Sequence, residues 1–288
     1  MLVIGGLVFL LLCVFGSFVA SGGAIAPLLA SMPFELLTIL GAGIGTFIMA
    51  NSMGDLKHVP AAFKSALKGP SYGKRDYMDL LGLLFFFTRL AQSQGLMALE
   101  SHVETPTEST AFAAYPKIRD NERARDMICD YLRMMSMNMD DAFQIDDVMT
   151  RELAKNLKEE THISHGMQQL ADALPALGIV AAVLGVIKTM GSITKPPEVL
   201  GEMIAGALVG TFLGVLLAYG IVGPIATRMR SVAEEEASYY DLIRVVFVAH
   251  LQGNAPQVSV EIGRKDIPVH YMPSFLEMDT AISEQAIG

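Results

Sequence analysis

Apolar residues are concentrated in blocks along this chain, and the blocks set the first predictions. The first 54 residues carry one charged side chain, Glu35, and residues 203–227 carry none. A helix needs roughly 20 mostly apolar residues to cross a bilayer, so the blocks predict membrane spans. We place four of them at residues 1–21, 34–51, 170–191 and 202–224.

The two remaining segments, 52–169 and 225–288, have mixed charge and no strand-rich stretch. We expect a long amphipathic helix over residues 77–103 and a later helix that continues directly into the third span. In the tail we expect a helix over 228–252, followed by an irregular end that includes APQVSVEIGRK. The expected fold class is therefore all-α: an integral membrane protein with four transmembrane helices and a helical cytoplasmic domain.

Lysine and arginine placement predicts the orientation, because cytoplasmic loops carry the excess of basic residues. The connection 22–33 has no basic residue and the connection 192–201 has only Lys195. The basic residues near the other span ends are Lys57, Lys64, Lys68, Arg228 and Arg230. Segments 52–169 and 225–288, and both termini, are therefore expected in the cytoplasm. Lys188 lies near the outer end of the third span, where its amine can reach the interface.

Residues 1–21 invite comparison with a secretory signal peptide. They lack a basic first region, and their apolar stretch is longer than that of a typical signal peptide. We expect a retained span.

Composition excludes several kinds of function. The formal net charge is −9 with no basic tract, which argues against a nucleic-acid partner. Two cysteines, Cys13 and Cys129, make no disulfide framework, and we expect structural thiols. His162 and His165 lack enough neighbouring ligands for a metal site, so a solvated helix face is expected. No nucleophile triad or phosphate loop is visible, and an enzyme is not expected.

Small residues repeat every four positions in the fourth span. Gly206, Gly210, Gly214 and Ala218 fall on one helix face, which allows another helix to approach closely. Glycine is common in membrane helices, so the pattern predicts a packing face without naming its partner.

Prolines and polar side chains in the spans are few. Pro175 lies inside the third span, where either a static kink or a moving hinge would accommodate it. Pro224 lies at the inner end of the fourth span, where it either ends the helix or joins Pro175 in one movable layer. Asp172 and Glu202 are at span edges, and Thr211 is a hydroxyl within the fourth span. A titrating carboxylate at membrane depth is therefore expected from another subunit.

Several long stretches resemble the MotA family of flagellar motor stator subunits. They include GGAIAPLLASMPFELLTILGAGIGTFIMAN, YMDLLGLLFFFTRLAQSQGLMALESHVETPTES, DALPALGIVAAVLGVI and GALVGTFLGVLLAYGIVGPIA. The resemblance implies a bacterial inner-membrane protein surrounded by lipid. It implies a homo-oligomeric, pentameric ring around a dimer of a single-span MotB-like partner. The ring then turns against the rotor protein FliG.

The resemblance also implies roles for residues along the ion path. Pro175 and Pro224 match prolines tied to coupling ion flow with movement, and Thr211 matches a pore-facing threonine. Ala182 matches a position that is typically threonine in sodium-driven relatives and alanine in proton-driven ones. Protons are therefore the expected transported ion, sodium is disfavoured, and no cofactor is expected.

One part of the family pattern is altered. Members of the family contact the rotor through an arginine and a glutamate eight residues apart; Glu100 matches the glutamate, but Gln92 stands at the arginine position. Arg89 lies three residues earlier, close to the same helix face as Gln92. Three interpretations stay open: Arg89 supplies the charge, the motor distributes its charges differently, or Arg89 and Glu100 are only solvated.

Other functions fit the chain less well. An energiser of the ExbB/TolQ type, serving outer-membrane transport, is the main alternative, but such chains usually have three spans. A secondary transporter would normally show inverted repeats and polar groups near the membrane midplane. The predicted function is a stator subunit that couples proton flow to torque.

Overall fold

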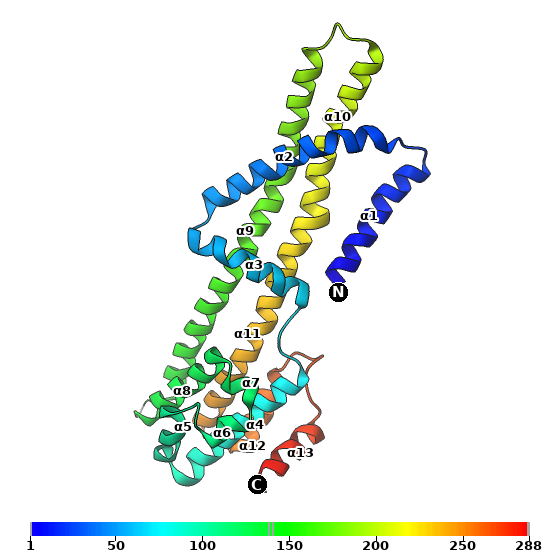
Figure 1. Cartoon of the computed structure of the whole chain (residues 1–288). Coiled ribbons are helices and arrows are strands. Elements are labelled where there is room, and N and C mark those ends of the chain that lie inside the picture. The colour runs from blue at the N-terminus through cyan, green and yellow to red at the C-terminus, as the bar shows by residue number, and fades with distance from the viewer. Residues whose placement is uncertain (1, 138, 140, 287–288) are drawn as a thin grey trace. The chain divides into compact units, whose positions relative to one another are not determined.

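The computed structural model describes residues 2–137, 139 and 141–286, and across these residues it contains helices and no strand (Figure 1). The described residues are 85% helical, which confirms the all-α fold class. The elements, in chain order, are α1 (Leu2–Ala20), α2 (Ile25–Ala50), α3 (Met53–Lys68), α4 (Lys74–Gln94), the 3₁₀ turn η1 (Leu96–Leu99), α5 (Glu100–Glu104), α6 (Thr110–Ala113), α7 (Pro116–Arg119), α8 (Glu122–Ser136), α9 (Ala142–Met190), α10 (Pro197–Val215), the π-helical segment η2 (Leu216–Val222), α11 (Gly223–Leu251), α12 (Pro256–Asp266) and α13 (Phe275–Ala286).

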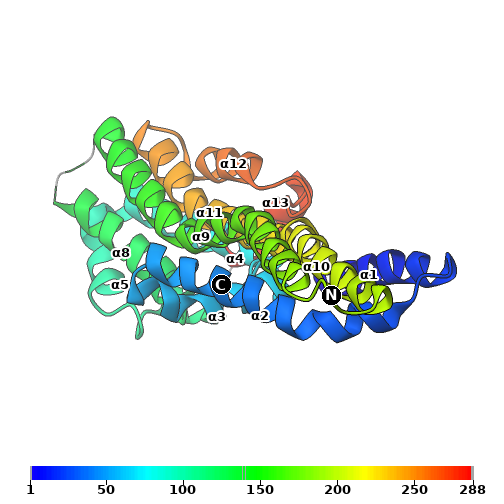
Figure 2. The ribbon, with the colours of Figure 1, turned by 90° about the horizontal axis from the view of Figure 1, so that it is seen from above.

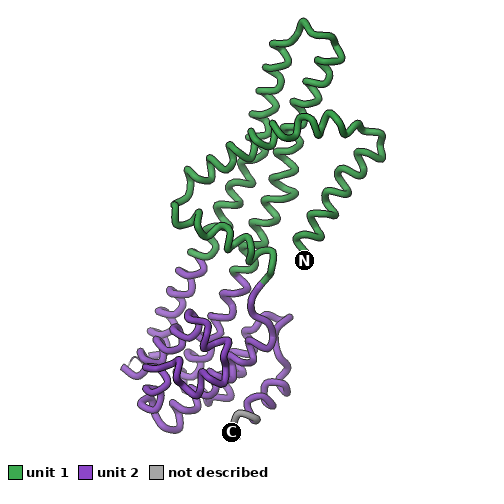
Figure 3. Tube along the Cα trace, in the orientation of Figure 1, with its two compact units in different colours: residues 1–69, 159–233 green, residues 70–158, 234–288 purple. Residues whose placement is uncertain are grey.

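Two compact units divide the chain, and each is built from two separate stretches of sequence (Figure 3). Unit 1 comprises residues 1–69 and 159–233, and unit 2 comprises residues 70–158 and 234–288. The division differs from the expected one, since residues 52–69 fold with the spans. Residues 234–288 fold with the middle segment rather than forming a separate tail.

Four helical stretches are long and apolar enough to cross a membrane: α1, α2, α9 and the continuous stretch from α10 through α11. This confirms the four expected transmembrane helices. α2 is longer than the predicted second span, because it begins at Ile25 rather than at residue 34. Pro27 falls in its first turn, where the missing N–H needs no partner, so it does not delay the helix start.

Unit 1 has a small core where α2, α9 and α10 meet. Ile39 of α2, Leu174 of α9 and Leu213 of α10 are buried there. α9 and α10 lie side by side (Figures 1 and 2), and α2 packs on both of them. By contrast, α1 has no buried residue in the described chain, as expected for a helix whose surface faces lipid or another protein.

Unit 2 has a much larger core, centred on α4. Ten residues of this helix are buried, including Tyr77, Leu81 and Phe87, against α8, α11 and α12. A helix that is apolar on most of its faces is expected to be buried all round. The run LLGLLFFF therefore belongs to the core of unit 2.

The predicted single helix over residues 77–103 is wrong. α4 ends at Gln94, and Gly95 follows with φ +81°, its N–H donating to the Ala91 carbonyl at 3.0 Å. A glycine in the left-handed region is a common way to end a helix, since it has no Cβ to clash. The chain then changes direction through η1 and α5, so Glu100 is not on the helix that carries Arg89.

The irregular end expected after residue 252 is also wrong. Residues Pro256–Asp266 form α12, which buries Pro256, Val260 and Gly263. Proline at the first helical position and apolar residues three to four apart are a helix signal that the sequence did contain. α13 follows and packs on α4, with its Glu277 paired to Lys74 at 2.7 Å.

Candidate functional site

α9 and α10 approach each other at backbone distance. A Cβ placed on Gly214 would lie 2.7 Å from the Leu174 carbonyl oxygen and 2.9 Å from the Gly178 Cα. A Cβ placed on Gly185 would lie 2.6 Å from the Ala207 Cβ. These distances are shorter than van der Waals contact, so only glycine allows the two helices to meet here.

The four small residues singled out from the fourth span all lie in buried positions. Gly210 and Gly214 face α9, and Gly206 faces Ser31 of α2, whose Oγ would lie 2.8 Å from an added Cβ. Ala218, in η2, is fully buried. One face of α10 therefore contacts α9 and α2 of the same chain.

Ala182 and Thr211 lie on the edge of this contact. The Ala182 backbone nitrogen would be 3.2 Å from a Cβ on Gly210, the residue that precedes Thr211. Both side chains are partly exposed. The Thr211 hydroxyl makes no hydrogen bond within the described chain, whereas Thr189 donates to the Gly185 carbonyl at 2.9 Å. Thr211 is therefore available to an outside group.

Both predicted prolines lie inside continuous helical stretches. α9 runs through Pro175 over 49 residues, and helical structure continues through Pro224 into α11. The interpretation that Pro224 ends its helix is wrong. Instead the π-helical segment η2 precedes it, and the Gly223 N–H donates to the carbonyl of Ala218, five residues earlier. A wider turn there relieves the clash that a proline ring makes with the preceding turn.

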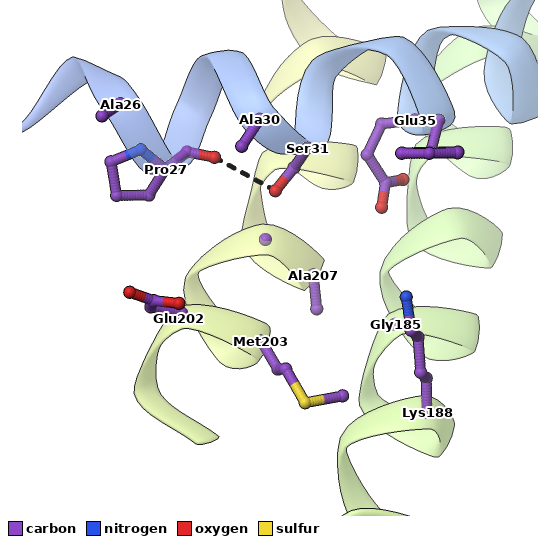
Figure 4. Close-up of a pocket in the computed structure, with 12 residues that line it drawn as sticks. Ala26, Pro27, Ala30, Ser31, Glu35, Gly185, Lys188, Glu202, Met203 and Ala207 are labelled. Atoms are coloured by element: carbon purple, nitrogen blue, oxygen red, sulfur yellow. Dashed lines mark hydrogen bonds between the residues drawn. The ribbon is translucent and has the colours of Figure 1, made fainter. Parts of the chain in front are cut away.

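A polar pocket near the loop between α9 and α10 was not expected from the sequence (Figure 4). It has a volume of about 500 Å³ and is lined by residues of α2, α9 and α10. Glu35 projects from α2, and the Lys188 ammonium projects toward it from α9 (Figure 4). Because α2 begins at Ile25, Glu35 lies ten residues into the helix rather than at its start.

The Glu35 carboxylate rests directly on α10. One of its oxygens would lie 2.7 Å from a Cβ placed on Gly210, so the glycine leaves room for it. Glu35 makes no hydrogen bond within the described residues, although Lys188 attracts it across the pocket. A charge at this depth is costly unless it is paired, and Lys188 is the available counter-charge. One sequence signal could have revealed the pair. Glu35 and Lys188 are an acidic and a basic residue that both lie inside predicted membrane spans.

The three expected rotor-facing residues are exposed in unit 2. Arg89 and Gln92 share α4, whereas Glu100 begins α5 beyond the Gly95 break. The Arg89 guanidinium makes neither a hydrogen bond nor an ion pair with any residue that the structure describes. Arg133 differs, since it bonds Glu104 at 3.1 Å and Asp130 at 2.9 Å.

The part of the chain that the structure describes holds no group of three or more His, Cys, Asp or Glu side chains close enough to bind a metal ion. His162 instead lies 3.5 Å from the Asp55 carboxylate. Cys129 is buried in the core of unit 2, which raises the pKa of its thiol to about 12 and keeps it unreactive.

Comparison with protein families identifies two matching regions. Residues 4–95 match the family described as Motility protein A N-terminal, and residues 120–241 match the MotA/TolQ/ExbB proton channel family. Motility protein A of Escherichia coli K12 is 38% identical over 283 residues, which cover 97% of this chain and 94% of that protein. The chain belongs to the motility protein A family.

A second relative is similar over nearly the whole chain, and two solved structures match its fold. Chemotaxis protein LafT of Vibrio parahaemolyticus is 31% identical over 280 residues, covering 97% of this chain and 98% of that protein. The fold matches a chain of the flagellar MotAB stator complex from Bacillus subtilis with a TM-score of 0.70 and 23% identity, over 96% of this chain and 98% of that one. A chain of C. jejuni MotAB gives a TM-score of 0.74 at 16% identity, over 95% and 98%. The chain is therefore a stator subunit of the flagellar motor rather than an ExbB/TolQ-type energiser.

Proposed function

We propose that this stator subunit forms a homo-oligomeric ring, with five copies around a dimer of a single-span MotB-like partner in the bacterial inner membrane. Protons pass where the ring meets the partner, and the ring turns against the rotor protein FliG. The proposed orientation keeps both termini and unit 2 in the cytoplasm. No resident cofactor and no catalytic step are part of this function.

The observation that carries the proposal is the contact between α9 and α10. Two helices in backbone contact form a rigid pair, and the Ala182 backbone nitrogen of α9 would lie 3.2 Å from a Cβ placed on Gly210, the residue before Thr211. The Thr211 hydroxyl has no partner in the described chain, so it can bond water or a partner's carboxyl group. Ala182 adds no further hydroxyl, which favours a proton over a dehydrated sodium ion, since sodium needs several oxygen ligands.

In the proposed mechanism the partner's aspartate takes up a proton from outside and loses its charge in a low-dielectric setting. The charged and neutral forms interact differently with the ring, and relief of that difference rotates it. The driving force is roughly 2.3 kcal/mol per charge for each 100 mV of membrane potential. Pro175 and Pro224 transmit the movement, and Arg89 and Glu100 meet the rotor.

Swimming speed tests the function and its ion together. A strain that relies on this chain and its partner is measured at fixed pH while sodium is varied, and then with a protonophore added. Speed that is independent of sodium and collapses with the protonophore supports proton drive. Speed that follows sodium retains the stator but refutes the ion choice, and a strain with uptake defects and normal swimming refutes the torque function.

A further inference from the structure

α3 begins directly after the second membrane helix. α2 ends at Ala50, and only Asn51 and Ser52 separate the two helices. The Ser52 hydroxyl accepts a hydrogen bond from the Asp55 N–H at 3.3 Å, and the Asp55 carboxylate accepts one from the Ser52 N–H at 3.0 Å. This reciprocal pair fixes the start of a helix. The chain therefore leaves the end of the span as an ordered helix.

The buried face of α3 packs where two other spans end (Figure 1). Ala66 of α3 is buried against Ile163 of α9 and Met229 of α11. Ile163 comes shortly before the expected span 170–191, and Met229 comes shortly after the expected span 202–224. All of these residues belong to unit 1. α3 therefore lies at one boundary of the membrane, where an amphipathic helix rests along the bilayer surface.

The opposite face of α3 is basic. Lys57, Lys64 and Lys68 are seven and four residues apart, a spacing that places them on one side of a helix. All three side chains are exposed, and none of their ammonium groups pairs with a residue that the structure describes. Lys74 and Lys117 differ, since each binds a carboxylate at 2.7 Å. The positive charge of α3 is therefore left for a group outside the chain.

The composition around these lysines adds to the pattern. Residues 56–69 hold three lysines and no acidic residue, although the whole chain has a formal net charge of −9. Met53 and Phe63 of the same helix are 75% and 39% exposed. Exposed apolar side chains beside a basic face are typical of helices that insert at the level of lipid headgroups. The ammonium group of lysine binds phosphate as a point charge.

We propose that the basic face of α3, formed by Lys57, Lys64 and Lys68, binds the phosphate groups of anionic phospholipids. Its place at a span boundary favours lipid over an acidic protein, because headgroup phosphates surround spanning helices at this depth. Basic segments next to a span attract anionic headgroups. The inference goes beyond torque generation. Only the choice of the cytoplasmic leaflet rests on the proposed orientation, and only the repetition of the face around a ring rests on the proposed assembly.

Lipid contact is measured on the purified complex, with its partner subunit, in vesicles of phosphatidylcholine and phosphatidylglycerol. A fluorescent maleimide on Ala61→Cys reports the contact, in a chain with Cys13→Ser and Cys129→Ala and a partner free of cysteine. Ala61 is exposed and lies four residues from Lys57, on the same side of α3. Either lipid is added with the same spin label near its headgroup. We expect phosphatidylglycerol to quench the dye about twofold or more strongly than phosphatidylcholine, and high salt to reduce the difference by screening.

Two double variants show whether the lysines cause the preference. Lys57→Gln with Lys64→Gln should bring the two lipids to nearly equal quenching. Lys68 stays in place, because a basic residue in the last turn stabilises the helix end. Lys155→Gln with Lys265→Gln is the matched control, since it removes the same charge from exposed lysines of unit 2. The control should keep the full preference for phosphatidylglycerol.

Three results would overturn the proposal. The first is equal quenching by both lipids while all the lysines of α3 are present. The second is a preference that survives Lys57→Gln with Lys64→Gln. The third is quenching by neither lipid, which would assign the basic face to a protein surface. The vesicles have the same lipids in both leaflets, so an inverted orientation would not change the result. Failure to drive swimming would refute the proposed function and leave the lipid preference standing.

Discussion

At the scale of single residues, the contact between α9 and α10 depends on the absence of one carbon atom. Gly214 faces backbone atoms on the opposite helix, and backbone cannot move aside as the end of a flexible side chain can. Gly45 in α2 has open space where its Cβ would be. The two glycines therefore look alike in the sequence and differ fully in the structure.

Gly214→Ala should destabilise the protein by on the order of 1–3 kcal/mol, because the new Cβ forces the helices apart. Thermal unfolding of the purified complex in detergent measures the effect. Gly45→Ala is the control and should leave the unfolding temperature the same or slightly higher, since alanine favours helix. Equal destabilisation by both variants would contradict the packing argument.

The polar pocket is a second residue-scale feature with a direct test. Lys188→Met leaves Glu35 without its counter-charge and should lower the unfolding temperature of the complex. The double variant Glu35→Gln with Lys188→Met removes both charges and should be more stable than Lys188→Met alone. Coupling energies of roughly 0.5–3 kcal/mol are usual for such pairs. Additive effects of the two substitutions would mean that the charges do not interact.

His102 predicts a pH dependence of stability. Its Nδ1 lies 2.7 Å from the Ser109 hydroxyl, and partial burial lowers its pKa below the ordinary value. The unfolded chain then binds more protons than the folded one between the lowered pKa and about 6.5. Stability is therefore complete above about pH 6.5 and falls as the pH decreases through that window. His102→Gln should flatten this part of a curve of unfolding temperature against pH; an unchanged slope would assign it to another group.

At the scale of elements, glycine and proline mark the places where the described helices end or change geometry. Gly95 ends α4 with a left-handed residue, and η2 widens the helix before Pro224. Both glycine and proline are visible in the sequence, yet neither alone predicts the outcome. The sequence predicts a helix that continues through Gly95, and it leaves Pro224 as a possible helix end. Packing decides whether a glycine or a proline interrupts a helix.

Pro224→Ala should remove the reason for the π-helical segment, since alanine restores an N–H and removes the ring clash. A change from π to α geometry rotates the following residues of α11 relative to those before it. We expect normal complex formation with loss of most swimming speed. Pro256→Ala is the control, because Pro256 lies at the first position of α12 where no N–H is needed. Swimming at full speed in the Pro224 variant would refute a coupling role.

At the scale of the whole molecule, the proposed orientation in the membrane rests on the basic residues that flank the spans. Thr194 lies in the loop between α9 and α10, and Thr107 lies in unit 2, and both are exposed. A single cysteine at each site, in a chain with Cys13→Ser and Cys129→Ala, reports which side of the membrane it occupies. We expect a membrane-impermeant maleimide to label Thr194→Cys in intact cells and Thr107→Cys only after lysis. The reverse pattern would invert the proposed topology.

The sequence by itself determined the membrane spans, the all-α class and the family. Apolar length is a local property, so the four transmembrane helices could be predicted without knowing what they contact. The motif stretches are also contiguous in sequence, and so they identified the family before any fold was known. The sequence also predicted that a helix of the middle segment continues into the third span. This prediction rested on local pattern, and the structure contains the helix as α9.

Only the tertiary structure decided which side chains meet. Glu35 and Lys188 are far apart in the chain, and their shared pocket depends on where α2 begins and how it crosses α9 and α10. The turn at Gly95 likewise separates Arg89 from Glu100. A helical repeat of 3.6 residues defines the faces of each helix, but which faces pack together is set by contacts distant in sequence.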